Sequence, residues 1–448
     1  MKGGKQSHIV VLGAGFGGLT FCKNFRHPNA RITLIDRTNH HLFQPLLYQV
    51  ATCALSATDV AQPIRGILSH RPDITVLLDK ATGFDLAHKK VFLEKSALDY
   101  DYLVLALGGH TGYFGHLEWE PFAPGLKTLD DALRLRSRIL FAFEKAESET
   151  DPLEHDRLMT IVVVGGGPTG VELAGSFAEL TRTVMNLDFR RIDPAQAHVL
   201  LLEGGPRILA HLPPELSEKA KWQLIHLGVT VKTDTQVKSI REGVVELANG
   251  KIIQAGNIVW AAGVASSPLT KKLGCELDRG GRVKVNPDLC LPGHPEVFAI
   301  GDLALVLQGD GKPVPGVSPA AMQMGKHVAK IIATELRSGS SATSRPAFKY
   351  CDKGTMATIG RSAAVAQMGK LKLSGYPAWL AWLFVHLIFL IGFRNRTAVL
   401  FQWAYSYFSN RRSARIITHQ PHEVEDGGFI YSKSESEGCC ENSRALRQ

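Results

Sequence analysis

The sequence Ile9-Val10-Val11-Leu12-Gly13-Ala14-Gly15-Phe16-Gly17-Gly18 joins an apolar run to a glycine-rich turn, and Ile161-Val162-Val163-Val164-Gly165-Gly166-Gly167-Pro168-Thr169-Gly170 repeats this design. In both places a β-branched strand pattern precedes the turn and a helical pattern follows it. In that context a G-x-G-x-x-G match predicts a dinucleotide site. One such site is typical of a dehydrogenase, whereas two predict a protein that holds two dinucleotides and passes a hydride between them.

Each fingerprint needs an acidic residue at the end of the next strand, where a carboxylate can accept a hydrogen bond from a ribose hydroxyl. Asp36 has this place for the first site, about 20 residues on, and Glu203 is the candidate for the second, after a longer connection. A carboxylate at Glu203 repels a 2′-phosphate, so we expect NADH to be preferred over NADPH. The alternative is a pair of ordinary glycine turns before buried helices. The glycines expected to contact cofactor are Gly13, Gly15, Gly17, Gly18, Gly165, Gly167 and Gly170.

The periodicity of apolar residues predicts further elements around the fingerprints. In the first half we expect a strand over 8–12, a helix over 19–26, a strand over 31–36 and a buried strand run over 102–109. In the second half we expect a helix over 129–147, a polar connection over 181–196, and strand runs over 198–202, 258–263 and 296–302. The two halves therefore share an order of fingerprint, acidic strand end and late glycine-capped strand.

Length and composition indicate a folded protein of two or three domains, with 448 residues, 45% hydrophobic and 21% charged. The net charge of +9 favours anionic partners such as phosphate-bearing cofactors or acidic lipid headgroups. The alternative is that the charge only keeps the protein soluble. No motif supports nucleic-acid binding. Seven scattered cysteines without C-x-x-C or zinc spacing indicate a reducing compartment and no metal site. Glycines interrupt the first apolar stretch, so no secretory signal fits, and we expect the catalytic body to face the cytoplasm.

Two carboxylates outside the strand ends lie where a ligand can reach them. Asp302 follows Gly301 at the carboxyl end of a strand run, where it can bond to a flavin's ribityl chain or cap a helix. Glu172 lies just inside the second fingerprint's helix, where the helix dipole favours a carboxylate whatever its function. Its functional alternative is a place near the contact of nicotinamide and flavin, guiding the hydride or handling a proton. His40 and His41 are a weaker signal, because paired loop histidines are more often solvated or bound to phosphate than catalytic.

Three stretches carry a resemblance to a known family. They are NHHLFQPLLYQVA at 39–51, GGGPTGVELAG at 165–175 and WLAWLFVHLIFLIGFRNR at 379–396. Through them the chain, from about residue 9 to 417, resembles the type II NADH dehydrogenases, which are single-subunit NADH:quinone oxidoreductases among the two-dinucleotide flavoproteins. The resemblance implies an α/β fold with two Rossmann-like, glutathione-reductase-like dinucleotide domains, FAD at the first fingerprint and NADH at the second.

The resemblance also implies site residues. FAD would be held by the first fingerprint with Asp36, Arg37, Ala106, Gly108, Gly301 and Asp302, and NADH by the second with Glu203, Ala262 and Gly263. The expected catalytic residues are Glu172 and Gln323. The family's quinone pocket has an Ala-Gln pair followed three residues later by another Gln. Gln323 matches that last glutamine, whereas Ser318-Pro319 replaces the pair. The quinone-site candidates are Phe43, Gln44, Leu47 and Gln323.

The expected domain order follows from the fingerprints and the resemblance. An FAD-binding domain takes residues 1–120 and 276–375, and an NADH-binding domain at 121–275 is inserted between its two parts. A short α-helical, membrane-associated region takes 376–420. A polar, disordered tail follows at 421–448.

The segment over 377–393 is nearly all apolar, and an aromatic stretch follows it to Phe408. Its apolar core is shorter than the roughly 20 residues that a spanning helix needs. We expect two short helices lying in one leaflet, which makes the protein peripheral (monotopic) on the cytoplasmic face of the membrane. The alternatives are a buried core helix, a helix of a homodimer interface, or a true span. The basic residues expected on anionic headgroups are Arg394, Arg396, Arg411, Arg412 and Arg415.

The predicted function is non-proton-pumping NADH:quinone oxidoreduction, in which a hydride passes from NADH to FAD and a membrane quinone is then reduced. No acidic intramembrane helix offers a proton path. Dithiol chemistry is not expected, because the loop after the first βαβ unit contains only Cys53. Two alternatives are a flavin-dependent NADH reductase of a small electron-carrier protein and a non-catalytic, NADH-sensing flavoprotein.

Overall fold

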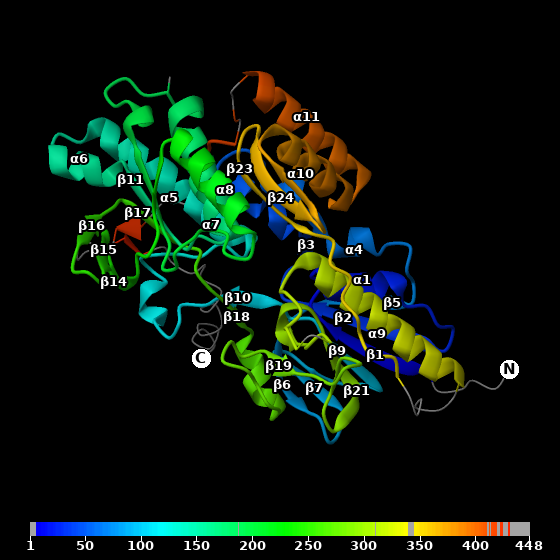
Figure 1. Ribbon diagram of the computed structural model, residues 1–448. Helices are drawn as coiled ribbons and strands as arrows, with labels where there is room; N and C mark the ends of the chain where they lie inside the picture. Colours follow the sequence, from blue (N-terminus) through cyan, green and yellow to red (C-terminus); the bar gives the residue numbers. More distant parts are fainter. Residues whose placement is uncertain are drawn as a thin grey trace, which may run out of the picture.

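A six-stranded sheet carries the first fingerprint in the computed structural model (Figure 1). Its order is β20-β21-β9-β1-β2-β5, and all neighbours are parallel except β20 and β21. Because β1 lies between β2 and β9, the chain order reverses beside β1, and ligands bind at such a switch point. Helices α1 (Phe16–Asn24) and α9 (Ser318–Ser338) pack against each other beside it. The strands are β1 (Ser7–Leu12), β2 (Ala30–Asp36), β5 (Ile74–Leu78), β9 (Tyr102–Leu105), β20 (Cys290–Leu291) and β21 (His294–Ala299).

A four-stranded parallel sheet carries the second fingerprint and repeats this plan. Its order is β13-β12-β11-β17, so β11 lies between the next strand and a late one, as β1 does. Its strands are β11 (Thr160–Val164), β12 (His198–Leu202), β13 (Val229–Lys232) and β17 (Asn257–Trp260). The helices of this half are α5 (Leu129–Ser148), α6 (Pro152–Leu158), α7 (Pro168–Glu179) and α8 (Pro214–His226).

Several small strand units accompany the two large sheets, and those named here are antiparallel except for the parallel pair of β19 and β22. β10 (Gly109–Thr111) leaves the first sheet and pairs with β18 (Val264–Ser266), which leaves the second, so the two connections run side by side. Two three-stranded units are β6 (Ala81–Asp85), β7 (Lys90–Leu93) and β8 (Ala97–Asp99), and β14 (Val237–Arg241), β15 (Val244–Leu247) and β16 (Ile252–Gln254). Two pairs are β3 (His40–Leu42) with β4 (Ala61–Pro63), and β19 (Val283–Lys284) with β22 (Ala304–Leu305). The short helices are α2 (Leu47–Ala51), α3 (Ala57–Val60) and α4 (Ile64–Ile67).

The C-terminal part forms a third layer beside α7 and α8 (Figure 1). A sheet of β23 (Thr355–Gly360), β24 (Ala363–Met368) and β25 (Leu371–Ser374) is covered by α10 (Tyr376–Phe389), and α11 (Phe393–Ser409) contacts α10 and α3. The expectation of two short helices here is confirmed. Among the described residues, none of the helices combines the length and the hydropathy that crossing a bilayer requires.

The described residues are 6–186, 188–309, 311–338, 345–409, 412, 414–418, 422–423 and 429–430. The polar tail expected over 421–448 lies outside them, apart from the short strands β26 (His422–Glu423) and β27 (Phe429–Ile430). The expectation of a helix over 19–26 was wrong at its start, because α1 begins at Phe16, inside the fingerprint. The glycine turn thus passes directly into the first helical turn, whose free N–H groups point toward the sheet edge.

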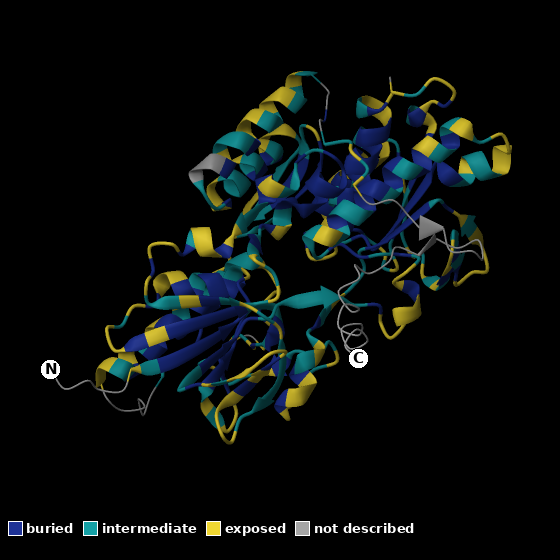
Figure 2. Ribbon diagram, turned by 180° about the vertical axis from the view of Figure 1, so that it is seen from behind, coloured by how far each residue is buried: buried dark blue, intermediate teal, exposed yellow. Residues whose placement is uncertain are grey.

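Burial follows the two sheets. Figure 2 shows their strands as the buried interior, with exposed positions on the outer helices and loops. All five residues of β11 are buried, as are the last five of β1. Parallel strands covered on both faces are apolar along their whole length, which explains why both fingerprints begin with continuous Val and Ile runs.

Candidate functional site

The first fingerprint forms a turn without room for side chains on its inner side. Gly13 has φ +99°, which favours glycine, and a Cβ atom there would collide with the carbonyl group of Ala106. A Cβ atom on Gly18 would collide with the carbonyl oxygen of Gly13, so α1 packs directly on the turn. Gly15 faces open space, since a Cβ atom there would meet nothing within 4 Å. The turn therefore offers bare backbone that a pyrophosphate can approach closely.

Asp36 supports this turn from the end of β2. Its Oδ2 accepts the N–H of Ala14 at 2.6 Å, and its Oδ1 accepts both the N–H and the hydroxyl of Thr38 at 2.8 Å. A carboxylate has about four lone-pair positions, so Asp36 keeps room for one more donor, such as a ribose hydroxyl. Arg37 is exposed beside it. Open glycine backbone and a free acceptor position fit a dinucleotide such as FAD.

The other residues expected at FAD lie at the carboxyl ends of parallel neighbouring strands. Ala106 follows β9 and is buried, and Gly108 has φ +66° and faces open space. Gly301 has φ +73° after β21. Asp302 lies in the first turn of the 3₁₀ helix η6 (Gly301–Leu303), whose N-cap is Ile300, so the helix-cap alternative for Asp302 is wrong. Because β9, β1 and β21 are parallel neighbours, these groups share one edge of the sheet with Asp36.

The second fingerprint has the same construction. Gly165 has φ +111°, and a Cβ atom there would lie 2.6 Å from Cα of Ala262. A Cβ atom on Gly170 would collide with the carbonyl oxygen of Gly165, whereas Gly167 faces open space. Gly263 packs closely on the connection that leaves the first sheet. The turn thus leaves bare backbone at the same place as the first fingerprint does.

Glu203 is bonded in the second site as Asp36 is in the first. One carboxylate oxygen accepts the N–H of Gly166 at 2.6 Å, and the other accepts the N–H of Gly205 at 2.7 Å. Asp36 likewise bonds to the second residue of its turn and to the amide two residues further on. The long connection between β11 and β12 therefore leaves this geometry intact.

Glu172 lies half-buried on α7, next to the Tyr48 side chain. Burial raises the pKa of Glu172 to about 8, and a hydrogen bond from the backbone of Thr358 opposes the shift. Burial, and after it the charge of Glu172, raise the pKa of Tyr48. The Tyr48 hydroxyl accepts a hydrogen bond from Nε2 of Gln49 at 2.9 Å, and Oε1 of Gln49 accepts the indole N–H of Trp403 at 2.8 Å. Hydrogen bonds therefore connect α11 to the surroundings of Glu172.

Phe43 and Leu47 belong to the apolar interior. They are 3% and 2% exposed, in a core shared with α5 and α7. The Phe43 ring meets the edge of the His386 ring, with centroids 6.3 Å apart, and His386 stacks on Trp382 at 4.2 Å. Burial lowers the pKa of His386 to about 4, so its ring is neutral. Aromatic contacts therefore lead from α10 to Phe43, a setting that suits an apolar ring.

The two glutamines expected near quinone have main-chain partners. Gln44 is exposed, and its Nε2 donates to the carbonyl oxygen of Lys127 at 3.0 Å. Gln323 lies on α9, where its amide donates to the carbonyl oxygen of Cys351 and accepts the N–H of the same residue, both at 2.9 Å. Gln323 therefore fixes the segment that leads into β23, while Ser318 begins α9.

Sequence reasoning missed several residues of this region. Tyr48 and Gln49 stand next to Leu47 inside the quoted 39–51 stretch, and a polar pair on a short apolar helix was a usable signal. The sequence gave no signal for the partners of Trp403 and Arg412, because those partners lie far away along the chain. Thr358 reaches Glu172 through its backbone, and a backbone contact carries no sequence signal.

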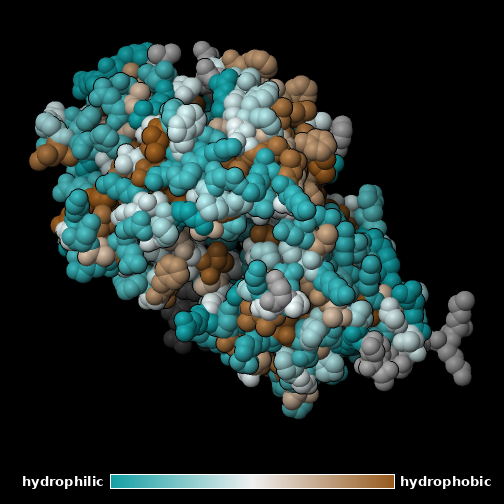
Figure 3. All heavy atoms as spheres, in the orientation of Figure 1, coloured by the Kyte–Doolittle hydropathy of each residue, from teal (hydrophilic) through white to brown (hydrophobic). Residues whose placement is uncertain are grey.

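Exposed apolar side chains gather on α10 and α11, where Figure 3 shows brown side chains together on the surface. Four of those on α10 are spaced four residues apart and therefore share one face. On other faces of the two helices, Trp382 and Val399 are fully buried. The exposed residues are Tyr376, Leu380, Phe384, Ile388, Phe389, Leu400, Phe401, Tyr405 and Phe408.

Three of the basic residues expected on headgroups, one within α11 and two after it, bond to the protein itself. Arg412 is buried, pairs with Glu179 at 2.6 Å and donates to the carbonyl oxygen of Thr52 at 2.9 Å. The expectation that Arg412 lies on headgroups is therefore wrong. The Arg396 guanidinium donates to carbonyl oxygens at the end of α10, and Arg415 pairs with Asp188, so both fasten the C-terminal segment. Arg411 and the side chain of Arg394 lie outside the described part of the chain.

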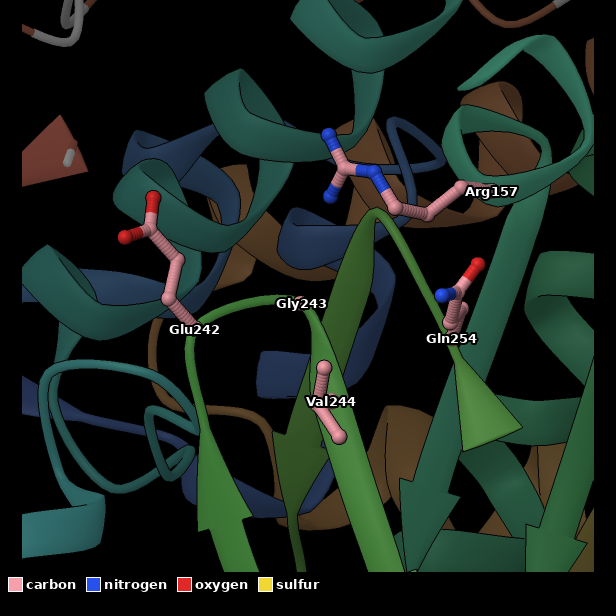
Figure 4. Close-up of a pocket in the computed structure, with 5 residues that line it drawn as sticks. All are labelled: Arg157, Glu242, Gly243, Val244 and Gln254. Atoms are coloured by element: carbon pink, nitrogen blue, oxygen red, sulfur yellow. The ribbon is translucent and has the colours of Figure 1, made fainter. Parts of the chain in front are cut away.

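Two of the surface hollows in the described part of the protein are lined by residues between 157 and 254, in the region that carries the second fingerprint. One, of about 240 Å³, is lined by Arg157 of α6 and by residues of the β14–β16 sheet, including Gln254, and contains no fingerprint residue (Figure 4). The other, of about 300 Å³, lies between Gly204 and the 234–236 segment that follows β13. Gly204 directly follows Glu203, so this second hollow adjoins the acidic end of the second fingerprint.

Comparison with known proteins gives matches over nearly the whole chain. The family described as pyridine nucleotide-disulphide oxidoreductase matches residues 7–325, and the NDH2 C-terminal domain matches residues 353–412. The type II NADH:quinone oxidoreductase NdhA of Mycobacterium tuberculosis is 44% identical over 93% of this chain and 90% of its own length. The type II NADH:quinone oxidoreductase of Staphylococcus haemolyticus is 32% identical over 83% of this chain and 92% of its own length.

Solved structures share the fold. NDH2 from Plasmodium falciparum in complex with NADH has a TM-score of 0.83 at 21% identity, covering 91% of this chain and 99% of that one. The sulfide:quinone oxidoreductase of Aquifex aeolicus has a TM-score of 0.67 at 18% identity, covering 90% and 95%. The expected α/β class with two Rossmann-like sheets is confirmed.

Proposed function

Since the chain belongs to the pyridine nucleotide-disulphide oxidoreductases, and among them to the type II NADH:quinone oxidoreductases, we propose that it oxidises NADH with FAD and reduces a membrane quinone without pumping protons. The observation that carries this proposal is the pair of fingerprints, in which Asp36 and Glu203 make the same bonds to two glycine turns. When bound, FAD supplies the two-electron chemistry that no side chain here can supply.

We assign the cofactors by the residues at the two turns. The open backbone at Gly15, with the free acceptor position of Asp36, holds the FAD pyrophosphate and ribose. The matching surface at Gly167, with Glu203, holds NADH. The Glu203 carboxylate is held in place by hydrogen bonds from two amides, so a 2′-phosphate beside it would be repelled. The enzyme therefore prefers NADH to NADPH.

Glu172 handles a proton in this scheme. The overall reaction takes NADH, quinone and one proton to NAD⁺ and quinol. With its pKa raised to about 8, Glu172 carries a proton at neutral pH, which an ordinary carboxyl does not. It lies beside Tyr48 and two residues after Gly170, the last glycine of the second fingerprint. Glu172 therefore supplies the proton that the product requires.

We assign the quinone site to the region of Phe43 and Leu47, with Gln44 and Gln323 at its border. Phe43 and Leu47 provide apolar contact, and α10 connects this region to the exposed apolar face. Gln323 acts there by holding the main chain of Cys351.

The exposed apolar residues of α10 and α11 rest on the lipid, so the protein is peripheral, on the cytoplasmic face. We further propose the domain limits 1–120 with 276–375 for FAD, 121–275 for NADH, and 376–420 for the lipid-associated helices, and a homodimer as the assembly.

A vesicle sedimentation assay tests the lipid contact. Phe384→Asp should reduce vesicle binding, whereas Leu153→Asp should not, although Leu153 on α6 is also highly exposed. Equal binding of the two variants would contradict the assignment.

The proposed activity is tested with the purified protein, a soluble ubiquinone analogue and a soluble menaquinone analogue. The protein should be yellow, should oxidise NADH faster than NADPH, and should build no pH gradient when reconstituted in vesicles. A protein that stays colourless after addition of FAD, or that leaves both quinones unreduced, would refute the proposal. Turnover with a small electron-carrier protein in place of quinone would instead support the carrier-reductase alternative.

A further inference from the structure

Both fingerprint turns are held at a carbonyl group as well as at an amide. In the second turn the carbonyl oxygen of Gly166 accepts the main-chain N–H of Leu209 at 2.7 Å. In the first turn the corresponding carbonyl, that of Ala14, lies 2.8 Å from Nδ1 of His41. The amides of the same two residues are bonded alike, to Glu203 and to Asp36. His41 thus replaces, with a side chain, a main-chain donor of the other site.

The His41 ring is buried at the position where it contacts the Ala14 carbonyl. It is 3% exposed, lies on β3, and meets the edge of the Phe16 ring with centroids 5.1 Å apart. A carbonyl oxygen only accepts, so Nδ1 carries the hydrogen and Nε2 is left as an acceptor. Nε2 is buried and has no hydrogen-bond partner among the described residues. Since an unpaired buried nitrogen costs free energy, packing alone does not explain a histidine here, and the bond to Ala14 does.

The bond to Ala14 sets the direction of a neighbouring amide. A trans peptide is planar, so its C=O and N–H point in opposite directions. The carbonyl of Ala14 and the N–H of Gly15 belong to one peptide. When the Ala14 carbonyl points at His41 in the interior, the Gly15 N–H points the opposite way, away from His41. In the second site Leu209 orients the N–H of Gly167 in the same way.

We propose that His41 is a positioning residue of the FAD site, which orients the peptide between Ala14 and Gly15 so that its N–H points at the cofactor's pyrophosphate. This inference rests on the proposal that the first fingerprint holds FAD. Without the donor, the Ala14 carbonyl is an unsatisfied buried acceptor, and the peptide can rotate its oxygen toward the phosphate, which repels it. The loss concerns FAD alone, because the corresponding carbonyl of the NADH turn is held by a main-chain N–H, that of Leu209.

Three variants separate this role from general stability. His41→Leu removes the donor, and His41→Asn keeps an amide N–H near the position of Nδ1. The matched control is His40→Leu, because the half-buried His40 ring makes its hydrogen bond, within the described part of the chain, to the neighbouring Asn39 side chain. FAD is removed from each protein, and its Kd is measured by titrating FAD back while flavin fluorescence is followed. The NADH KM is measured separately in FAD-saturated enzyme.

We expect His41→Leu to raise the Kd of FAD about tenfold, the effect of one lost buried hydrogen bond, with the NADH KM changed less than about twofold. His41→Asn and His40→Leu should bind FAD as the unaltered protein does. If His41→Leu binds FAD normally, or if His41→Asn binds it as weakly as His41→Leu, the inference fails.

A further pair of variants covers poor folding of His41→Leu. His41→Gln carries the same amide as His41→Asn, one methylene further from the backbone, and should bind FAD more weakly. Equal FAD affinity of these two would also overturn the inference. If the unaltered protein itself binds no FAD, the proposed function fails instead, so the two failures are distinct.

Discussion

Replacing Glu172 by glutamine tests whether this carboxyl holds a proton in the folded protein. Its pKa is raised by burial from the ordinary 4.5 to about 8. Between these values the folded protein keeps a proton that the unfolded chain has released, so stability falls as pH rises. The slope is about 1.4 kcal/mol per pH unit and flattens as pH passes the folded pKa. The free energy of unfolding should therefore drop by about 2 kcal/mol from about pH 6 to pH 8 through this group alone.

Glu172→Gln keeps the size and shape of the side chain and removes the ionisable carboxyl group. Its free energy of unfolding should lack this decrease, so the variant gains on the unaltered protein by about 2–3 kcal/mol between about pH 6 and pH 9. Urea unfolding of the FAD-loaded proteins, followed by flavin fluorescence at each pH, measures the difference. Glu218→Gln, which removes an exposed carboxylate on α8, is the control and should follow the unaltered protein.

The same titration should appear in turnover. Quinone reduction by the unaltered enzyme should fall as pH rises through about 8, because the protonated fraction of Glu172 falls there. Glu172→Gln should be slower and should lack this alkaline limb. Identical pH dependences of both stability and rate in the two proteins would refute the assignment of a protonated carboxyl.

Three further substitutions have defined outcomes. Gly18→Ala places a Cβ atom against the Gly13 carbonyl, so the purified protein should lose its FAD, measured as flavin absorbance per chain. Glu203→Gln removes the charge that repels a 2′-phosphate, and the ratio of kcat/KM for NADPH to that for NADH should rise at least about tenfold in steady-state assays. Arg412→Ala leaves the Glu179 carboxylate half-buried and without its ion pair, which should cost about 3–5 kcal/mol of stability, measured by urea unfolding. An unchanged unfolding midpoint for Arg412→Ala would contradict the buried pair.

The two-sheet architecture was predictable because its signals are local. A strand of β-branched residues, a glycine turn and an acidic residue at the next strand end lie within one βαβ unit, and Asp36 meets its turn as that rule requires. The start of α1 was missed by three residues, because Phe16 and Gly17 look like part of the turn in sequence although they already have helical backbone. The start of such a helix depends on backbone geometry, and because glycine adopts both turn and helical conformations, the sequence does not show where the helix begins.

Long-range partners were not predictable. Arg412 follows an apolar stretch and was expected at headgroups, yet it pairs with Glu179, 233 residues earlier in the chain. Gln323 matches a family glutamine, but its contact with the main chain of Cys351 depends on how α9 meets the segment before β23. In both cases the residue type indicates that the side chain needs a polar partner, but the identity of that partner depends on how distant elements pack together.

The C-terminal helices have two different sides, one exposed and apolar and one in contact with the interior near Tyr48. On one side they expose large apolar side chains such as Phe384 and Phe408. On the other, Trp382 is buried beside His386, and Trp403 is hydrogen-bonded to Gln49, next to Tyr48 and Glu172. The helices are therefore hydrogen-bonded to the residues next to the Glu172 carboxyl, and they also carry the exposed apolar face that we propose as the lipid contact. Deleting them would remove both features at once, so only single surface substitutions can separate the two roles.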